Sequence, residues 1–231
     1  MPALSQIGAI VRAHDPDRYL CALFATPRER EALFAILAFN HEVAKTREVV
    51  SETMLGQIRL QWWREAIDGI IAGTPRHHEV VIPLADAFQS FNLDRAPFDA
   101  ILDAREADLE DAPFQTLEDL MAYALGTAGS LSHVGLRILD ATDEATARAG
   151  EAIAVAWSLT GLLRAIPLLA RGKRLMLPSD LLQAHEVRIG DYHELRDREA
   201  IRAVVRFIVG AARAALDDVA GVASEGFKQA A

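Results

Sequence analysis

The chain has 231 residues, of which 51% are hydrophobic and 25% charged, so it is long enough and apolar enough to fold around a core. Its formal net charge of −9 argues against nucleic-acid binding, which needs a basic surface. The single cysteine, Cys21, excludes an internal disulfide and a cysteine-based zinc site, and it is compatible with the reducing cytoplasm.

Apolar residues recur at helical spacing along the whole chain, and the alternation typical of strands is nearly absent, which predicts an all-α fold. Asp15–Pro16 and Thr26–Pro27 each combine a capping residue with a proline that suits the first helical position. We expect one long helix over 29–52 after the second of these starts.

The remaining helices are expected over residues 53–72, 78–91, 97–110, 116–132, 143–170 and 198–222. The small and polar tail 221–231 is expected to fray. Because no repeat or low-complexity linker interrupts the pattern, we expect a single domain over 1–231.

The most apolar part of the chain, residues 152–170, is interrupted by Arg164 and Pro167. No run reaches the roughly 18–20 uncharged apolar residues that a membrane span requires, and the N-terminus lacks a signal-peptide pattern. We therefore expect a cytoplasmic protein without a membrane-spanning segment.

Five stretches carry an unusual pattern: Leu37–Val43, Arg59–Gly69, Arg105–Leu109, Tyr123–Gly129 and Leu159–Arg164. In this order and spacing they resemble the squalene/phytoene synthase family over roughly Asp15 to Leu182. The resemblance implies an isoprenoid-synthase-type helical bundle around a central cavity. It also implies a reaction, the head-to-head joining of two prenyl diphosphates.

Enzymes of that family hold Mg²⁺ with two aspartate-rich motifs, because hard cations bound by carboxylates neutralise a diphosphate leaving group. Two carboxylates four residues apart lie on one helix face and reach the same metal. Here the first motif falls on Ala44 and Glu48, with Lys45 where a second aspartate often stands. The second motif falls on Ala165 and Leu169, so Glu48 is the only metal ligand that remains.

The resemblance also marks positions for binding a prenyl diphosphate: Arg47, Tyr123, Gly129, Arg164, Arg171 and Arg174. Arginines bind phosphate directly, so binding without turnover is one possibility. At Gly129 a small residue suits either a tight helix contact or room for a prenyl chain. No cofactor is expected, apart from Mg²⁺ if the chain is active, and Gly161 replaces the asparagine of the second motif.

Within the family, the pattern around Ala38–Phe39–Asn40 and Arg59–Asp68 is most similar to a degenerate branch. That branch includes the mitochondrial assembly factor for respiratory complex I and its bacterial relatives. It implies a non-catalytic protein that acts through a protein partner, with peripheral contact at the inner membrane. Two alternatives stay open, an active Mg²⁺-dependent prenyltransferase and a carrier that holds a prenyl lipid in the cavity.

Several polar and aromatic residues have ordinary structural interpretations. Trp62 and Trp63 are turned by about 100° from each other on a helix, so one is expected in the core and the other near the surface. Arg105 is expected to pair with a neighbouring acid. Neither His41 nor His77–His78 has the spacing of a metal site.

Overall fold

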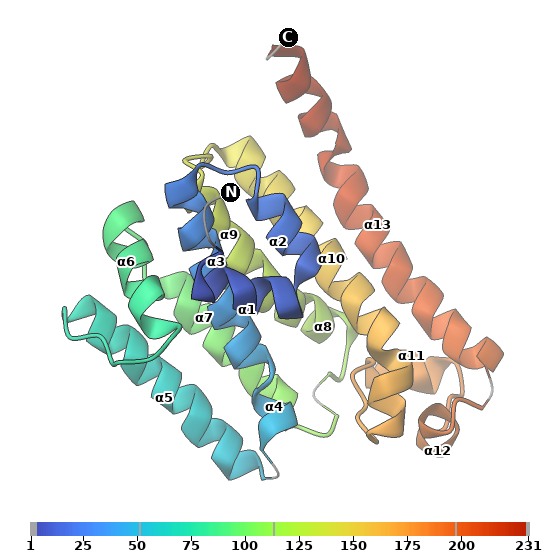
Figure 1. The fold of residues 1–231 in the computed structure, drawn as a ribbon. Coiled ribbons are helices and arrows are strands. Elements are labelled where there is room, and N and C mark those ends of the chain that lie inside the picture. The colour runs from blue at the N-terminus through green and yellow to red at the C-terminus, as the bar shows by residue number, and fades with distance from the viewer. Residues whose placement is uncertain (1–3, 51, 113, 197, 230–231) are drawn as a thin grey trace. The chain divides into compact units, whose positions relative to one another are not determined.

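The computed structural model describes residues 4–50, 52–112, 114–196 and 198–229, with side chains as far as Val219. Over these residues the chain forms helices and loops and no strand, which confirms the predicted all-α class (Figure 1).

The chain divides into two compact units. Unit 1 comprises Met1–Leu109 and Ser130–Thr142, and unit 2 comprises Glu110–Gly129 and Asp143–Ala231. The single domain expected over 1–231, and the central cavity, stay predictions.

Unit 1 contains α1 (Gln6–His14), α2 (Pro16–Ala22), α3 (Pro27–Ala44), α4 (Thr46–Val49), α5 (Thr53–Ile71), α6 (Val81–Phe91), α7 (Ala96–Arg105), the 3₁₀ helix η1 (Glu106–Leu109) and α9 (Ser130–Ile138). Unit 2 contains α8 (Leu117–Ala124), the π-helix η2 (Leu125–Gly129), α10 (Glu144–Arg171), α11 (Ser179–Ala184), α12 (Ile189–His193) and α13 (Arg198–Gln229).

Capping hydrogen bonds form at the predicted helix starts. The Thr26 N–H donates to Glu29 Oε2 at 2.9 Å, and Pro27 occupies the first turn of α3. At the start of α10, Asp143 Oδ1 accepts from the Thr146 N–H at 2.9 Å. These caps satisfy amide groups that have no partner inside the helix, so each start is fixed by residues three apart in sequence.

Two predicted helices are interrupted. The helix expected over 29–52 ends at Ala44, where Lys45 forms a turn with φ −76° and ψ 0°, and only the short α4 follows. The helix expected over 116–132 contains the π-helix η2, in which Thr127 Oγ1 donates to the Tyr123 carbonyl at 2.7 Å. Beyond η2 the chain passes from unit 2 to unit 1.

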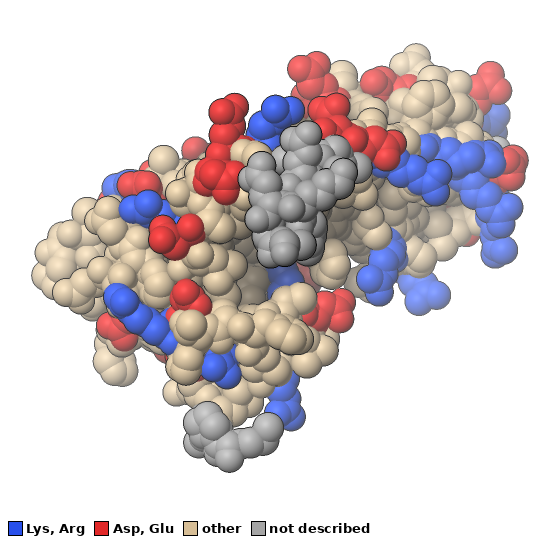
Figure 2. Space-filling view, turned by 90° about the horizontal axis from the view of Figure 1, so that it is seen from above, with Lys and Arg blue, Asp and Glu red and all other residues tan. Residues whose placement is uncertain are grey.

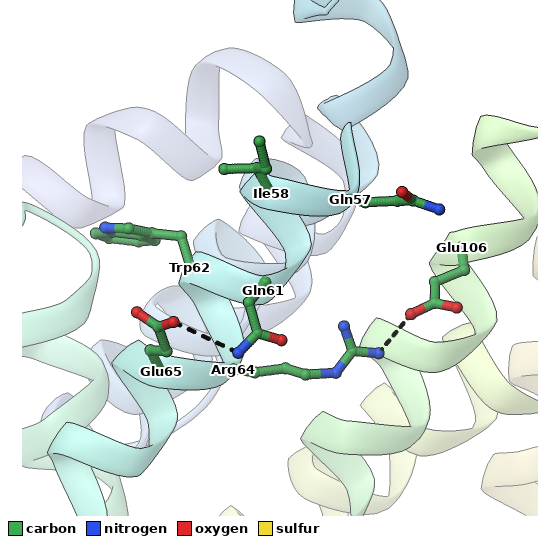
Figure 3. Close-up of a pocket in the computed structure, with 7 residues that line it drawn as sticks. All are labelled: Gln57, Ile58, Gln61, Trp62, Arg64, Glu65 and Glu106. Carbon is green, nitrogen blue, oxygen red and sulfur yellow. Dashed lines mark hydrogen bonds and ion pairs between the residues drawn. The ribbon is translucent and has the colours of Figure 1, made fainter. Parts of the chain in front are cut away.

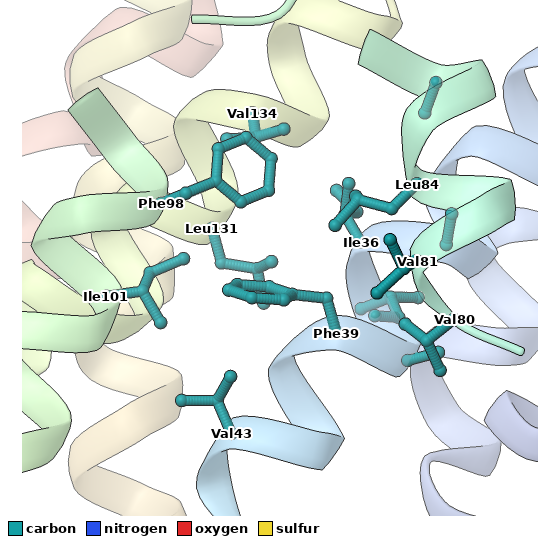
Figure 4. Close-up of a cluster of buried hydrophobic side chains, with 14 of the residues drawn as sticks. Ile36, Phe39, Val43, Val80, Val81, Leu84, Phe98, Ile101, Leu131 and Val134 are labelled. Atoms are coloured by element: carbon teal, nitrogen blue, oxygen red, sulfur yellow. The ribbon is translucent and has the colours of Figure 1, made fainter. Parts of the chain in front are cut away.

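The core of unit 1 is organised around α3 (Figure 4). Phe39 is fully buried and packs edge-on against Trp63 and Phe98, each with ring centroids 5.3 Å away. Burying a side chain of this size contributes about 1.5–3 kcal/mol. Trp63 is buried and Trp62 is half-buried, as the helix geometry predicted.

In unit 2 the long helices α10 and α13 run side by side in opposite directions (Figure 1). Each buries one stripe of residues at helical spacing: Val155, Leu159, Ile166 and Ala170 on α10, and Ile201, Val204, Ile208 and Ala212 on α13. Helix α13 continues to Gln229, beyond the predicted end near Val222. Residues 230–231 of the tail lie outside the described residues, and its fraying stays a prediction.

Helix α10 corrects the expectation that no segment has the length and composition of a membrane span. Its most apolar 18-residue window has a mean hydropathy of 1.7, and 22% of that window is buried. The interruptions at Arg164 and Pro167 are too few to lower the hydropathy of a helix this rich in leucine, isoleucine and alanine. No other helix in the described part of the chain is both long enough and apolar enough to span a membrane.

Candidate functional site

The first degenerate motif lies where α3 gives way to α4. Ala44 is the last residue of α3, and Arg47 and Glu48 follow within α4. The methyl group of Ala44 offers no oxygen to a cation, and the Glu48 side chain is exposed. The structure therefore brings Ala44, Arg47 and Glu48 together, but their segment supplies one solvated carboxylate.

The buried carboxylate near this motif belongs to Glu42, which is 9% exposed. Its Oε2 accepts from Arg59 Nη2 at 2.7 Å, and Lys45 Nζ donates to its Oε1. Arg59 Nη2 also lies 3.4 Å from the Glu42 carbonyl, so the guanidinium ties α5 to α3. Both carboxylate oxygens are already paired with cations of the protein.

Burial by itself would raise the pKa of Glu42, but the hydrogen bond from Lys45 and the charges of Lys45 and Arg59 outweigh it. The pKa of Glu42 is therefore lowered, and the group is ionised at neutral pH. Lys45 stands where a second aspartate is common in the family. The protein thus places an ammonium group of its own beside the carboxylate.

His41 is stacked on His14, with ring centroids 4.0 Å apart and the planes tilted by 14°. Burial lowers the pKa of His41, and the charges of His14 and Lys45 lower it further. The imidazole is accordingly neutral near pH 7.

A shallow groove of about 450 Å³ runs along α5 (Figure 3). Its lining consists of Gln57, Ile58, Gln61, Trp62, Arg64, Glu65 and Glu106. Arg64 closes one side by donating to Glu106 Oε1 at 2.8 Å and to Asp103 Oδ1 at 2.5 Å. Because these contacts satisfy Arg64 within unit 1, the groove is a mixed apolar and polar surface and offers no free cation for a diphosphate.

The second degenerate motif lies on α10 in unit 2. Ala165 and Leu169 are half-buried hydrocarbons, whereas Arg164 and Arg171 are exposed. Arg164 and Arg171 are seven residues apart and lie on one face of the helix. This motif has lost both carboxylates and kept positive charge.

Tyr123 and Gly129 lie in α8 and η2. The Tyr123 ring is half-buried and packs on Phe114, with centroids 5.2 Å apart. A Cβ at Gly129 would lie 2.9 Å from Leu125 Cδ1 and 3.6 Å from Glu151 Cγ. The close neighbour at this position is therefore Leu125 of η2 itself, whereas α10 lies at an ordinary van der Waals distance.

Arg174 follows α10 and is half-buried, with Nη2 3.7 Å from Met176 Sδ. Nearby, Tyr192 is fully buried. Burial raises the pKa of Tyr192 to about 12, although the charge of Arg174 opposes the shift. Arg174 therefore lies against the interior of unit 2, in contrast to the exposed Arg164 and Arg171.

The residues at the two motifs do not fit the Mg²⁺ site of the family's enzymes. Ala44, Ala165 and Leu169 have no oxygen ligand, and Glu48 is alone. Among the described residues, no group of three or more His, Cys, Asp or Glu side chains is arranged to hold a metal ion. On the face shown in Figure 2, acidic and basic side chains lie beside one another, so neither sign of charge covers it.

Arg105 pairs with an acid as expected, through Arg105 Nη1 and Asp108 Oδ2 at 3.0 Å. The sequence does not predict the pair between Glu42 and Arg59. The two residues are 17 positions apart on different helices, so no local pattern identifies the partner.

The family model for squalene/phytoene synthase matches residues 11–226. Complex I assembly factor 6 of Bos taurus is 33% identical over 196 residues, which cover 85% of this chain and 59% of that protein. The protein of the same name from Homo sapiens is 31% identical over the same shares. The chain thus spans under two thirds of the length of these curated relatives.

Among solved structures, the squalene synthase HpnC from Alicyclobacillus acidocaldarius superposes with a TM-score of 0.81. Its sequence is 20% identical, and the match covers 94% of this chain and 82% of that one. At this identity the likeness establishes the fold alone, and it confirms the isoprenoid-synthase-type arrangement expected from the motifs.

Proposed function

We propose a non-catalytic role for this chain, which belongs to the squalene/phytoene synthase family but lacks the metal ligands of its enzymes. In this proposal it binds a protein partner during the assembly of respiratory complex I. The observation that carries the proposal is the hydrocarbon at Ala44, Ala165 and Leu169, where the enzymes have carboxylates.

The chemistry of diphosphate departure supports the loss of catalysis. A diphosphate leaving group concentrates negative charge, and Mg²⁺ bound by several oxygens is what neutralises it in the family. One exposed glutamate cannot assemble such a site, and the nearby Glu42 is already paired with Arg59 and Lys45. The similarity to proteins named complex I assembly factor 6 supports the partner-binding role.

Catalysis is tested by pyrophosphate release from farnesyl and geranylgeranyl diphosphate, with and without Mg²⁺, for the wild type and Glu48→Ala. We expect no release above background from either protein. Mg²⁺-dependent release that Glu48→Ala abolishes would refute the proposal and make Glu48 a metal ligand.

The assembly role is tested by deleting the gene in its source cell and measuring assembled complex I on native gels. We expect less assembled complex, restored equally by the wild type and by Glu48→Ala. A stoichiometric complex with a respiratory subunit after purification would identify the partner. Unchanged complex I in the deletion strain would refute the assembly role.

A prenyl diphosphate held without reaction remains a separate ligand proposal, supported by the exposed guanidinium groups of Arg164 and Arg171. Equilibrium dialysis with farnesyl diphosphate tests it, with Arg164→Ala expected to weaken retention. For location, we propose the cytoplasm with peripheral contact at the inner membrane.

A further inference from the structure

Helix α10 presents an apolar face that no other described helix of unit 2 covers. Ile153, Trp157 and Leu168 are 56%, 49% and 71% exposed. Because successive helix residues are turned by about 100°, these three lie on one side of α10, together with Arg164 and Arg171. Single exposed apolar residues are ordinary on a protein surface, but an aligned set containing a tryptophan marks an interaction site.

The burial of α10 separates it from an ordinary core helix. A core helix as long and apolar as α10 is mostly buried, yet only 22% of the most apolar 18 residues of α10 are buried. The residues it does bury, among them Leu159 and Ile166, belong to the side that packs in unit 2 with α13. The opposite side exposes three large apolar side chains, Ile153, Trp157 and Leu168.

The charge on this face is positive. Arg164 lies between Trp157 and Leu168, Arg171 ends the helix, and Lys173 follows in the turn after it, all three exposed. In the described residues none of these cations forms an ion pair. Glu151, by contrast, belongs to another side of α10, since its Cγ lies near Gly129 of η2. The face is thus cationic in a chain whose net charge is −9.

We propose that this face of α10 binds the surface of an anionic lipid bilayer, with the helix lying in the plane of the interface. Trp157, Ile153 and Leu168 enter the boundary between headgroups and acyl chains, where tryptophan and leucine are favoured. Arg164 and Arg171 keep their guanidinium groups at the phosphates while their stems lie along the apolar layer. This inference rests on the peripheral membrane contact proposed above and names the surface that makes it, and it does not depend on the assembly role.

Two other occupants fit the observations less well. A second copy bound by two-fold symmetry would place the same cationic face on both sides of the interface, without a carboxylate of α10 on that face to compensate. A transmembrane position would draw in α13, which packs along α10 and carries the exposed ion-paired residues Glu199, Arg202 and Arg206.

The test is co-sedimentation of the full chain with vesicles of phosphatidylcholine and phosphatidylglycerol, and with vesicles of phosphatidylcholine alone. We expect binding to the anionic vesicles only. Reversing both charges in Arg164→Glu/Arg171→Glu is expected to weaken binding by about tenfold or more, since each basic residue near an anionic surface contributes several-fold. Trp157→Ser/Leu168→Ser is expected to weaken it comparably.

Matched controls come from equally exposed positions elsewhere. Arg202→Glu on α13 reverses the charge of an exposed arginine outside the proposed face, and Ile58→Ser on α5 removes a similarly exposed apolar side chain. Both controls are expected to bind as the wild type does. Brominated anionic lipid quenches the fluorescence of a tryptophan that enters the bilayer. We expect quenching in the wild type that is lost in Trp157→Ser, which keeps Trp62 and Trp63 as fluorescent residues. Circular dichroism checks that every variant is folded.

Several results would overturn the proposal. Absence of vesicle binding would do so, as would equal losses in the α10 variants and the controls. Dimerisation that Trp157→Ser/Leu168→Ser abolishes, without any vesicle binding, would assign the face to a second copy. Retention in membranes after alkaline extraction would indicate a spanning helix instead. None of these results alters the complex I measurement, so the two proposals fail separately.

Discussion

In unit 1 the first degenerate motif has exchanged metal ligands for an internal ion pair, whereas in unit 2 the second motif has exchanged them for hydrocarbon beside unpaired cations. Both carboxylate oxygens of Glu42 are paired, one with Lys45 and one with Arg59, and the pair with Arg59 joins α3 to α5. On α10, Arg164 is exposed and forms no ion pair with a described residue. Both motifs lack metal-binding carboxylates, but the charged groups near the first motif stabilise the fold, whereas those of the second motif are exposed to ligands.

The largest effect is expected from Glu42→Ala, which leaves two cations without their buried carboxylate. We expect it to lower the free energy of unfolding by about 2–3 kcal/mol, the range for charged hydrogen bonds at partly buried sites. Urea unfolding measures this, with the exposed changes Glu48→Ala and Arg164→Ala expected to stay within about 0.5 kcal/mol. Equal effects at all three positions would remove the distinction between the two motifs.

Glycine-to-alanine substitutions in α5 and α10 compare the packing around one helix of each unit. A Cβ at Gly56 in α5 would lie 2.4 Å from Cδ2 of the buried Leu109, so Gly56→Ala is expected to destabilise the protein by about 1–2 kcal/mol. A Cβ at Gly161 in α10 would meet nothing within 4 Å. Gly161→Ala is therefore expected to stabilise by about 0.5–1 kcal/mol through helix propensity. Thermal unfolding of both variants tests the predicted opposite signs.

The lowered pKa of Glu42 predicts a dependence of stability on acid. A carboxylate whose pKa is lower in the folded protein contributes stability above its unfolded pKa, near 4.5, and loses it as pH falls through the folded value. The difference in free energy of unfolding between wild type and Glu42→Gln should therefore shrink as pH falls below about 4.5. A difference that does not change with pH would mean that the ion pair contributes nothing through its charge.

The smallest effect is expected from His41. Its pKa is lowered from 6.5 by burial, and further by His14 and Lys45, so the folded state favours the neutral ring. That contribution is complete above pH 6.5 and is lost as pH falls through the lower folded pKa. His41→Gln should remove this part of the pH dependence in urea unfolding curves, and curves unchanged from the wild type would contradict the lowered pKa.

Much of the fold and part of the candidate site were predictable from the sequence. Thr26 with Glu29 and Asp143 with Thr146 begin helices through contacts three residues apart, and the burial of Trp63 with the partial exposure of Trp62 follows from helix periodicity. The substitutions at Ala44, Ala165 and Leu169 were evident because the surrounding motifs fix their positions. Each of these features depends on neighbours in the chain.

Other features needed the tertiary structure. The break at Lys45, the Glu42–Arg59 pair and the exposure of α10 depend on residues that are brought together, or left uncovered, by packing. Glu42 and Arg59 are 17 residues apart on different helices, so no local pattern joins them. An apolar helix has the same sequence pattern whether a neighbour covers it or not. The sequence alone therefore determined the helical class, the helix starts and the lost metal ligands, whereas packing decided which charges are paired and which apolar face is exposed.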